Sequence, residues 1–289
     1  MKKTSKREVT IVTCSCKECI RLPLEERPAG YKDEFIKVFY PGLGTRYLLP
    51  DHAEIKRYGM GNDARAHKEA KHGFQAGFEL EGTFPSLEAY GAALCGLYNF
   101  EPTSDSSIWC DEGEIAVELN TPVYRNFSGL QSLFRSLEKA GFCTVCNNTG
   151  HHVNISHADM NMHRIRQALI EIYNFGRWLE EHPDICEKCF GRCLNNYARP
   201  SLDLMEHYGF INLSNNNRVE FRLCKFNNAR QYYLTFCLCI DLMKTLMAFA
   251  GTDKQDQITR KLIRHCERHA AGEKSYIKRQ TDKYAHGTK

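Results

Sequence analysis

Five side chains that could bind a metal ion fall on the polar sides of four short segments. The segments alternate polar and apolar residues and read FQAGFELEGTF (74–84), EIAVELNT (114–121), HHVNIS (151–156) and RVEFRLC (218–224). A repeat of two residues predicts half-buried strands, since successive side chains of a strand point to opposite faces. The five metal-binding side chains on the polar faces are Glu79, Glu81, Glu118, His152 and Glu220.

The polar faces carry an unusual amount of acid for strands. Glutamate is depleted in strands, and like charges that face each other are destabilising. His152 beside four carboxylates therefore suggests that a divalent metal supplies the counter-charge. An antiparallel sheet with one wet face shows the same alternation, and alternation by itself leaves that interpretation open. Such faces usually carry Thr, Lys, Ser and Gln, whereas these segments carry carboxylates, an imidazole and two arginines.

The expected chemistry is that of a hard cation bound next to a phosphate. Carboxylate oxygens suit Mg²⁺ or Mn²⁺. Arg222 follows Glu220 by two residues on the same face, where it could hold a transferring phosphoryl group beside the metal. The sequence contains no GxxxxGK[ST] loop, which excludes a P-loop enzyme. Two-metal hydrolysis would use the same ligands and stays open.

The elements around these strands predict an α+β fold. Further strands are expected at 8–13, 34–40 and 45–49, and helices at 86–98, between Ser128 and Gly141, between Asp159 and Pro183, and at 229–250. A hairpin is expected to join 142–147 to 151–156, and a cysteine-rich turn is expected at 186–193. Each element hides one apolar side, so helices should pack on the back of an antiparallel sheet whose charged face is open.

Three regions are expected along the 289 residues. They are an N-terminal extension with a cysteine knuckle and a hairpin (1–72), a catalytic domain (73–251) and a basic tail (252–289). The tail holds ten Lys/Arg against five Asp/Glu, while the whole chain has a net charge of +4. It lacks interleaved aromatic residues, so a solvated helix is favoured over a nucleic-acid contact.

Neither a leader nor a membrane span is expected. No long apolar stretch follows the basic N-terminus, and Asp241 and Lys244 interrupt the apolar segment 232–250, which favours a buried helix. The fourteen cysteines are arranged partly in CxxC units, which is typical of metal binding in a reducing compartment and predicts a cytoplasmic protein.

Four motifs in order give the chain a family resemblance. They are GFELEGTF, DSSI followed by VELNTP, GHHVNIS, and VEFRLCKFNN, and they span roughly residues 74–250. Together they resemble the motifs of carboxylate–amine ligases with a glutamine-synthetase-like catalytic domain, most of all the putative amidoligase branch. The resemblance implies a curved antiparallel sheet whose concave face binds ATP and two or three Mg²⁺ ions. It also implies that ATP phosphorylates a substrate carboxylate and that an amine then displaces phosphate to form an amide.

The resemblance also assigns roles to residues. Metal ligation falls to the pair Glu79 and Glu81, and to Glu118, His152 and Glu220. Arg222 completes a Glu-x-Arg motif as a catalytic and nucleotide-binding residue, and the loop residue Asp105 would face the amine or the nucleotide. Asn154 stands where the family has a second histidine; its amide can donate and accept hydrogen bonds, so a contact with the metal or a phosphate stays open there.

Two cysteine knuckles predict a structural zinc site. Cys16 and Cys19 form one CxxC unit, and Cys186 and Cys189 form the other. Two such units commonly make a tetrahedral Zn²⁺ site, and buried free cysteines are the alternative. Cys143 and Cys146 are also spaced as CxxC, but residues three apart in a strand point to opposite faces, so they are expected in the core.

Three functions compete at this point. The leading hypothesis is an ATP- and Mg²⁺-dependent amide-forming ligase whose partners are a small-molecule or peptide carboxylate and an amine. The second is a phosphotransferase to a guanidino-type nitrogen, and the third is a non-catalytic, zinc-stabilised binding protein. The identities of the acid and the amine, and the oligomeric state, cannot be read from the residues.

The zinc hypothesis makes a direct prediction. If Cys16, Cys19, Cys186 and Cys189 share one ion, elemental analysis should find about one zinc per chain. Cys16→Ser and Cys189→Ser should each release it, because each thiolate is one of four ligands that meet only in the folded protein. Zinc-free protein in which all four thiols react at no cost to stability would support buried free cysteines instead.

Overall fold

A computed structural model describes most of the chain from residue 73 onward and three strands before it. The described residues are 9–13, 34–40, 44–48, 73–86, 89–90, 93, 101–103, 108, 110–111, 114–125, 127, 129–144 and 149–278. Cys16, Cys19 and Asp105 lie outside these residues, so the predictions made for them are not addressed by the structure.

The chain divides into two compact units. Unit 1 comprises Met1–Gly61, Glu81–Pro122 and Ser136–Thr149, and unit 2 comprises Asn62–Leu80, Val123–Arg135 and Gly150–Lys289. Strand β4 (Phe74–Phe84) and helix α2 (Leu130–Lys139) each contribute residues to both units.

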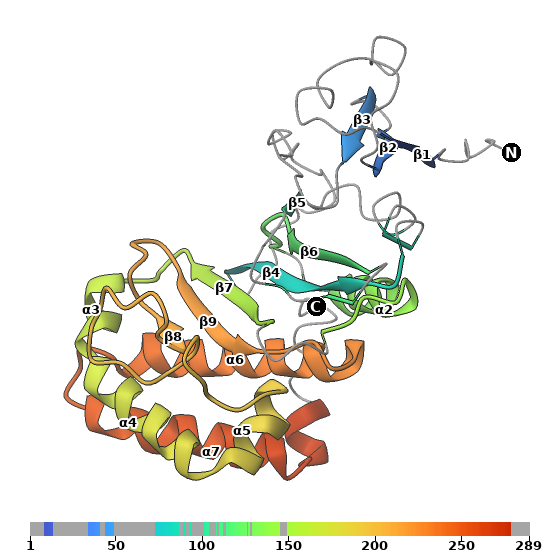
Figure 1. The fold of residues 1–289 in the computed structure, drawn as a ribbon. Coiled ribbons are helices and arrows are strands. Elements are labelled where there is room, and N and C mark those ends of the chain that lie inside the picture. Colours follow the sequence, from blue (N-terminus) through green and yellow to red (C-terminus); the bar gives the residue numbers. More distant parts are fainter. Residues whose placement is uncertain are drawn as a thin grey trace, which may run out of the picture. The chain divides into compact units, whose positions relative to one another are not determined.

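The sheet of unit 2 is antiparallel, with strand order β4-β7-β9-β8 (Figure 1). Its further strands are β7 (His151–His157), β9 (Val219–Cys224) and β8 (Ile211–Asn212). From residue 74 to residue 80 of β4, every second side chain is buried and the others are half-buried, which confirms the predicted alternation. In β9 all six residues are buried, so both of its faces are covered.

Strand β7 is the central strand between β4 and β9. Residues Phe74–Leu80 pair with His157–His151 in one ladder, and β9 pairs with the other edge of β7. The predicted hairpin between 142–147 and 151–156 is therefore wrong, because both edges of β7 are occupied by more distant segments. Cys143, which was expected in the first strand of that hairpin, instead forms an isolated antiparallel β-bridge with Thr83 of β4.

Helix α6 (Ala229–Phe249) covers one side of this sheet (Figure 1). It begins at Asn228, whose side chain accepts a hydrogen bond of 2.8 Å from the Gln231 amide, a standard N-cap. Phe236 on α6 contacts Phe78 of β4 edge-on, with ring centroids 5.3 Å apart. By length and composition α6 could cross a membrane, but most of its apolar stretch is buried in the protein, as predicted for a core helix.

A second helical layer lies on the far side of α6 (Figure 1). It contains α4 (Leu169–Glu181), α5 (Pro183–Phe190) and α7 (Ile258–Ala270). The short helices α3 (Met162–Gln167) and η3 (Gln255–Gln257) lie together, because Gln255 Nε2 donates to the Gln167 carbonyl oxygen at 2.9 Å. Within the predicted basic tail, α7 buries Ile258, Leu262 and Cys266 against this layer.

Two local predictions in this layer were wrong. The helix after β7 is capped by Asn161, which accepts a hydrogen bond from the Arg164 amide at 3.1 Å, and not by Asp159. The cysteine-rich turn is helix α5, because Pro183 suits a first helical turn and Gly191 ends the helix with φ 82°. Pro183 therefore does more than follow α4, because it is also the first residue of α5.

Unit 1 contains a separate small sheet and the remaining strands. The small sheet has the order β1-β2-β3 and is antiparallel, with β1 (Val9–Thr13), β2 (Glu34–Tyr40) and β3 (Gly44–Leu48). These three strands were predicted. Strand β5 (Glu101–Thr103) pairs with β6 (Ile115–Asn120), in which Val117 and Leu119 are buried as expected. Open antiparallel sheets combined with helices confirm the α+β class.

The aromatic contacts between β4 and α6 should dominate the stability of unit 2. Phe236→Ala should lower the free energy of unfolding by about 3–5 kcal/mol, because Phe236 is fully buried against Phe78 and Phe127. Arg230→Ala, on the exposed side of the same helix, should change it by less than about 0.5 kcal/mol. Urea denaturation measures both, and equal effects of the two substitutions would contradict the assignment of this core.

Candidate metal centre

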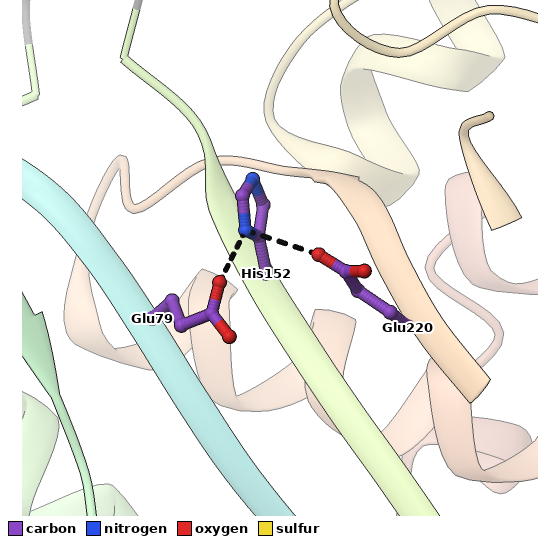
Figure 2. Close-up of side chains that lie close together, drawn as sticks. All are labelled: Glu79, His152 and Glu220. Carbon is purple, nitrogen blue, oxygen red and sulfur yellow. Dashed lines mark hydrogen bonds and ion pairs between the residues drawn. The ribbon is translucent and has the colours of Figure 1, made fainter. Parts of the chain in front are cut away.

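Three neighbouring strands each contribute one side chain to a compact cluster (Figure 2). His152 of β7 lies in the middle, with its Nδ1 atom 2.7 Å from Glu79 Oε2 on β4 and 3.2 Å from Glu220 Oε1 on β9. One potential ligand atom of each residue lies within 4.8 Å of the other two. The side chains of His152 and Glu220 are 9% and 6% exposed, and that of Glu79 is 27% exposed, so the cluster opens on the Glu79 side.

Strand register brings the three residues together. Glu79 pairs with His152 across the β4–β7 ladder, and Glu220 pairs with Asn154 across the β7–β9 ladder. Between the pairs His151–Cys224 and Val153–Phe221, β9 has one residue more than β7, so a bulge in β9 lies opposite His152. Such irregularities bend a strand and re-aim a side chain, which suits the position of His152 between two carboxylates.

The cluster has two alternative chemical states. If Nδ1 of His152 carries a proton, it can donate to both carboxylates. If Nδ1 is unprotonated, its lone pair and the carboxylate oxygens converge as one nitrogen and two oxygen ligands. The second state is a donor set that fits a divalent cation such as Mn²⁺ or Mg²⁺.

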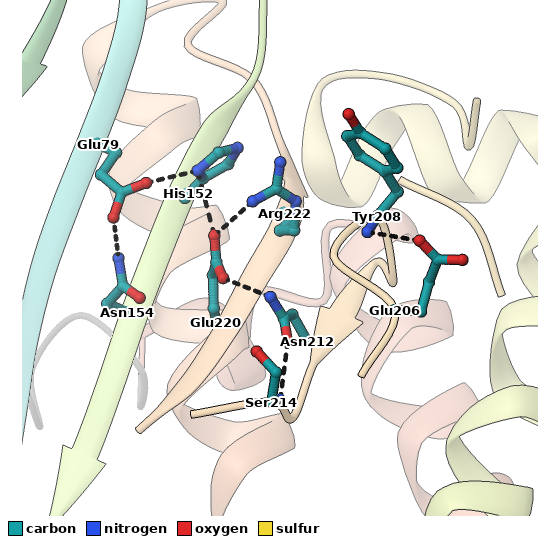
Figure 3. A network of polar contacts seen from close by, with 9 residues as sticks. All are labelled: Glu79, His152, Asn154, Glu206, Tyr208, Asn212, Ser214, Glu220 and Arg222. Atoms are coloured by element: carbon teal, nitrogen blue, oxygen red, sulfur yellow. Dashed lines mark hydrogen bonds and ion pairs between the residues drawn. The ribbon is translucent and has the colours of Figure 1, made fainter. Parts of the chain in front are cut away.

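Polar neighbours hold each carboxylate in place (Figure 3). Asn154 Nδ2 donates to Glu79 Oε1 at 3.0 Å, and Asn212 Nδ2 donates to Glu220 Oε2 at 2.8 Å. Arg222 Nη1 donates to Glu220 Oε1 at 2.7 Å in an ion pair whose side chains are only 8% and 6% exposed. Each acid therefore keeps a fixed orientation before any ion binds.

Arg166 stabilises the turn that carries Asn212. Arg166 of α3 donates to the Leu213, Ser214 and Asn215 carbonyl oxygens at 3.0, 3.1 and 2.9 Å, and also to the side chain of Asn216. The Ser214 amide in turn donates to Asn212 Oδ1 at 2.9 Å. The guanidinium thus holds the β8–β9 turn, and the turn orients the Asn212 amide toward Glu220.

The electrostatic balance favours the ionised form of Glu79. Burial opposes ionisation, but the hydrogen bond and charge of His152, the Asn154 hydrogen bond and the charge of Arg218 together hold the pKa of Glu79 below its usual value. A carboxylate that stays charged at neutral pH is the form that ligates a metal.

Three buried polar atoms near the cluster have no hydrogen-bond partner among the described residues. They are Asn154 Oδ1, Arg218 Nε and Arg222 Nε. Orphaned buried groups are rare in folded proteins, so these atoms beside a candidate metal centre are available to hydrogen-bond a polar ligand. The two guanidinium groups would attract an anion there.

The structure brings together part of the predicted site. Glu79, His152, Glu220, Arg222 and Asn154 form one connected group in unit 2. The other two predicted metal ligands belong to unit 1: Glu81 is buried on β4, and Glu118 on β6 accepts a hydrogen bond of 2.6 Å from Asn120. Their participation remains a prediction.

The described half of the predicted zinc site is buried. Cys186 and Cys189 lie on α5, where their thiols donate to the Arg192 and Cys266 carbonyl oxygens at 3.5 and 3.3 Å. Burial, together with the neighbouring Cys193, raises the pKa of Cys186 to about 12, so its thiol stays protonated. Metal binding at these thiols therefore stays a prediction that depends on Cys16 and Cys19.

Sequence reasoning missed two supporting residues. Asn212 belongs to a strand of two residues, too short to show a repeat. Arg166 lies on a helix that contributes no metal ligand, and no local pattern distinguishes it from a surface arginine. Only the tertiary arrangement shows that either residue acts on Glu220.

Comparison with known proteins shows the family of the chain. A protein-family model described as "Putative amidoligase enzyme" matches residues 52–281, well over half of the chain. The matched range contains the whole cluster and all four motifs, and it confirms the predicted membership of the putative amidoligase family. No curated protein matches the chain.

The two carboxylates should differ in their effect on stability. Glu79→Gln and Glu220→Gln should each weaken Mn²⁺ binding at least roughly tenfold in calorimetric titration, because each removes an anionic ligand. Glu220→Gln should also destabilise the protein, by up to about 3–5 kcal/mol, since it leaves the buried Arg222 without its counter-ion. Glu79→Gln should change stability less, because the Glu79 side chain is 27% exposed and its loss leaves no buried arginine without an ion-pair partner.

Exposed Glu267 provides a matched control for the loss of one negative charge. Glu267→Gln should leave both Mn²⁺ affinity and stability unchanged. Full-strength Mn²⁺ binding in Glu220→Gln would eliminate the cluster as the metal centre.

Proposed function

The chain belongs to the family of putative amidoligase enzymes, and on that premise we propose that it is an ATP- and Mg²⁺-dependent carboxylate–amine ligase. The observation that carries the proposal is the row of Glu79, His152 and Glu220 on three adjacent strands, with Arg222 bound to the last of them. Ligase chemistry of this kind needs a cation and an arginine at the same phosphoryl group.

The residues of the cluster fit the metal that such a ligase uses. Glu79, His152 and Glu220 would hold Mg²⁺, with Glu81 and Glu118 as further proposed ligands. Bound Mg²⁺ supplies positive charge against the phosphate oxygens of ATP. Asn154 and Asn212 fix the ligand carboxylates by hydrogen bonds, so little reorganisation is needed on binding.

The proposed first step transfers the terminal phosphoryl group of ATP to the acid. A carboxylate oxygen of the substrate attacks the γ-phosphorus, the bond to the bridging oxygen breaks, and ADP leaves with an acyl phosphate as the other product. Arg222 is placed to donate to the oxygens on which negative charge develops, because Nη1 is held by Glu220 while Nε is unpaired within the described structure.

The proposed second step forms the amide. The amine nitrogen attacks the acyl carbon, inorganic phosphate leaves, and the nitrogen loses a proton. The arginine at this site can neutralise the leaving phosphate as it neutralised the transferring group. Asp105 is the proposed group near the amine, on the basis of the motif resemblance alone.

A glutamine-synthetase-like catalytic fold is part of the same proposal. Open antiparallel strands with an acidic, metal-binding side, and helix α6 packed on the sheet, support it. The resemblance would make the acidic side concave and would place ATP on it.

Product analysis with mixed substrates tests the proposal. The enzyme is incubated with Mg²⁺, ATP and pools of amino acids and polyamines, and ADP, free phosphate and new amides are measured. A ligase releases ADP and phosphate in equal amounts only when an acid and an amine are both present. ADP without free phosphate, together with a phosphorylated guanidino compound, would show a phosphotransferase. No ADP release with any pool would reject both enzymatic functions.

The role of Arg222 yields a separate prediction. Arg222→Lys should lower kcat by roughly a hundredfold and change the KM for ATP much less, because lysine keeps the charge but not the planar fork that stabilises the transition state. The assay is steady-state ADP release with the best substrate pool. A variant whose only defect is a higher KM for ATP would contradict a transition-state role.

A further inference from the structure

Arg218 is a half-buried cation that forms no ion pair or hydrogen bond with the described residues. It immediately precedes β9. The half-buried arginines Arg166 and Arg268 in the described part of the chain each donate to an oxygen atom. A partly desolvated guanidinium without an acceptor is unfavourable, so Arg218 is better explained by a bound anion than by a structural role.

The position of Arg218 places this anion beside the metal centre. Residues 218, 220 and 222 alternate with the buried apolar residues of β9, so Arg218 and Arg222 flank Glu220 on one side of the sheet. The two arginines therefore lie on opposite sides of Glu220 along the strand, about 13 Å apart at the backbone.

Gly77 leaves open space on the same side of the sheet. It pairs with Asn154 across the β4–β7 ladder and lies two residues before Glu79. A side chain added at Gly77 would meet only Val123 Cγ2, at 4.0 Å. Glycine weakens a strand interior, and one explanation for its presence there is the close approach of a ligand.

Asn154 provides an acceptor next to this open space. Its Nδ2 donates to Glu79 Oε1, and because a carboxylate only accepts, this bond fixes Oδ1 as the free end of the amide. Asn154 Oδ1 is buried and has no partner within the described structure. It is therefore suited to accept from an N–H group of a ligand.

We propose that Arg218, Gly77 and Asn154 form the subsite for the acid substrate, and that this substrate is an α-amino carboxylate, either a free amino acid or the carboxyl end of a peptide. Arg218 binds its carboxylate, Gly77 leaves room for its backbone, and Asn154 Oδ1 accepts from its neighbouring nitrogen. The proposal rests on the proposed ligase function for the fate of the acid, but the binding itself does not require turnover.

The other arginine is better suited to the nucleotide. Tyr208 is 39% exposed, and its ring lies 6.0 Å from Arg222 Cζ, with Tyr197 edge-on to it at 5.7 Å. Exposed rings beside an arginine offer a stacking surface for a base and a clamp for its phosphates. Two anionic substrates would thus approach the metal centre from opposite sides of Glu220.

Ligand-induced stabilisation tests the subsite without catalysis. The probe is an equimolar pool of the twenty amino acids, titrated in the presence of Mn²⁺ while the midpoint of thermal unfolding is measured, with NaCl of equal ionic strength as the blank. Wild-type protein should be stabilised. Arg218→Gln should raise the half-saturating concentration roughly tenfold or more, because a charge-assisted hydrogen bond is lost. The half-saturating concentration of Arg218→Lys should lie between those of the wild type and Arg218→Gln.

Two further variants separate the subsite from general effects. Gly77→Leu should abolish stabilisation by the pool while Mn²⁺ binding is retained, because Gly77 is not a metal ligand and the nearest atom to a side chain added there is Val123 Cγ2, at 4.0 Å. Arg230→Gln removes an exposed arginine of α6 and should behave like wild type.

The outcomes distinguish this inference from the proposed function. If the amino-acid pool stabilises the protein through Arg218 but no ADP is ever released, the subsite is supported and the ligase function is rejected. ADP release whose half-saturating pool concentration is the same in wild type and Arg218→Gln would keep the ligase and overturn the subsite. Absence of any stabilisation of the wild type by the pool, or loss of Mn²⁺ binding in Arg218→Gln, would also overturn it.

Discussion

The site depends on one electrostatic constraint, the placement of Glu79 and Glu220 on either side of His152 in the middle of a sheet. Two carboxylates so close together repel each other in a partly dehydrated environment unless positive charge or donated protons lie between them. His152 Nδ1, 2.7 and 3.2 Å from the two acids, occupies that position. The β4–β7–β9 register, the bulge in β9 opposite His152 and the supporting amides all serve to maintain this spacing.

Support for the constraint comes from far along the chain. Arg166 holds the β8–β9 turn, the turn orients Asn212, and Asn212 holds Glu220, while Arg222 neutralises the same carboxylate. A buried ion pair adds little stability by itself, because dehydration opposes the attraction. Under the proposed function, the pair would present both a preorganised ligand and an arginine to a phosphate.

The helices behind the sheet allow its polar side to be specialised. Rings from β4, α2 and α6 fill the apolar side, with Phe78 edge-on to Phe134 and Phe236. A second layer of helices covers α6, so the longest apolar helix of the described chain is enclosed and the core does not depend on the acidic side. Charged residues can therefore be concentrated on that side at a limited cost in stability.

The sequence by itself determined the class of fold, the period-two strands and the residues that make the cluster, because alternation places Glu79, His152 and Glu220 on polar sides whatever the strands pair with. It did not determine the order of the strands: the partners of β7 lie some seventy residues away on either side, and a local turn signal at 147–150 suggested a hairpin instead. It also could not reveal Asn212 or Arg166, whose roles arise from long-range hydrogen bonds. Side-chain periodicity is a local property that residue types encode directly, whereas pairing partners and supporting contacts are chosen by the packing of the whole unit, so only the tertiary structure decided them.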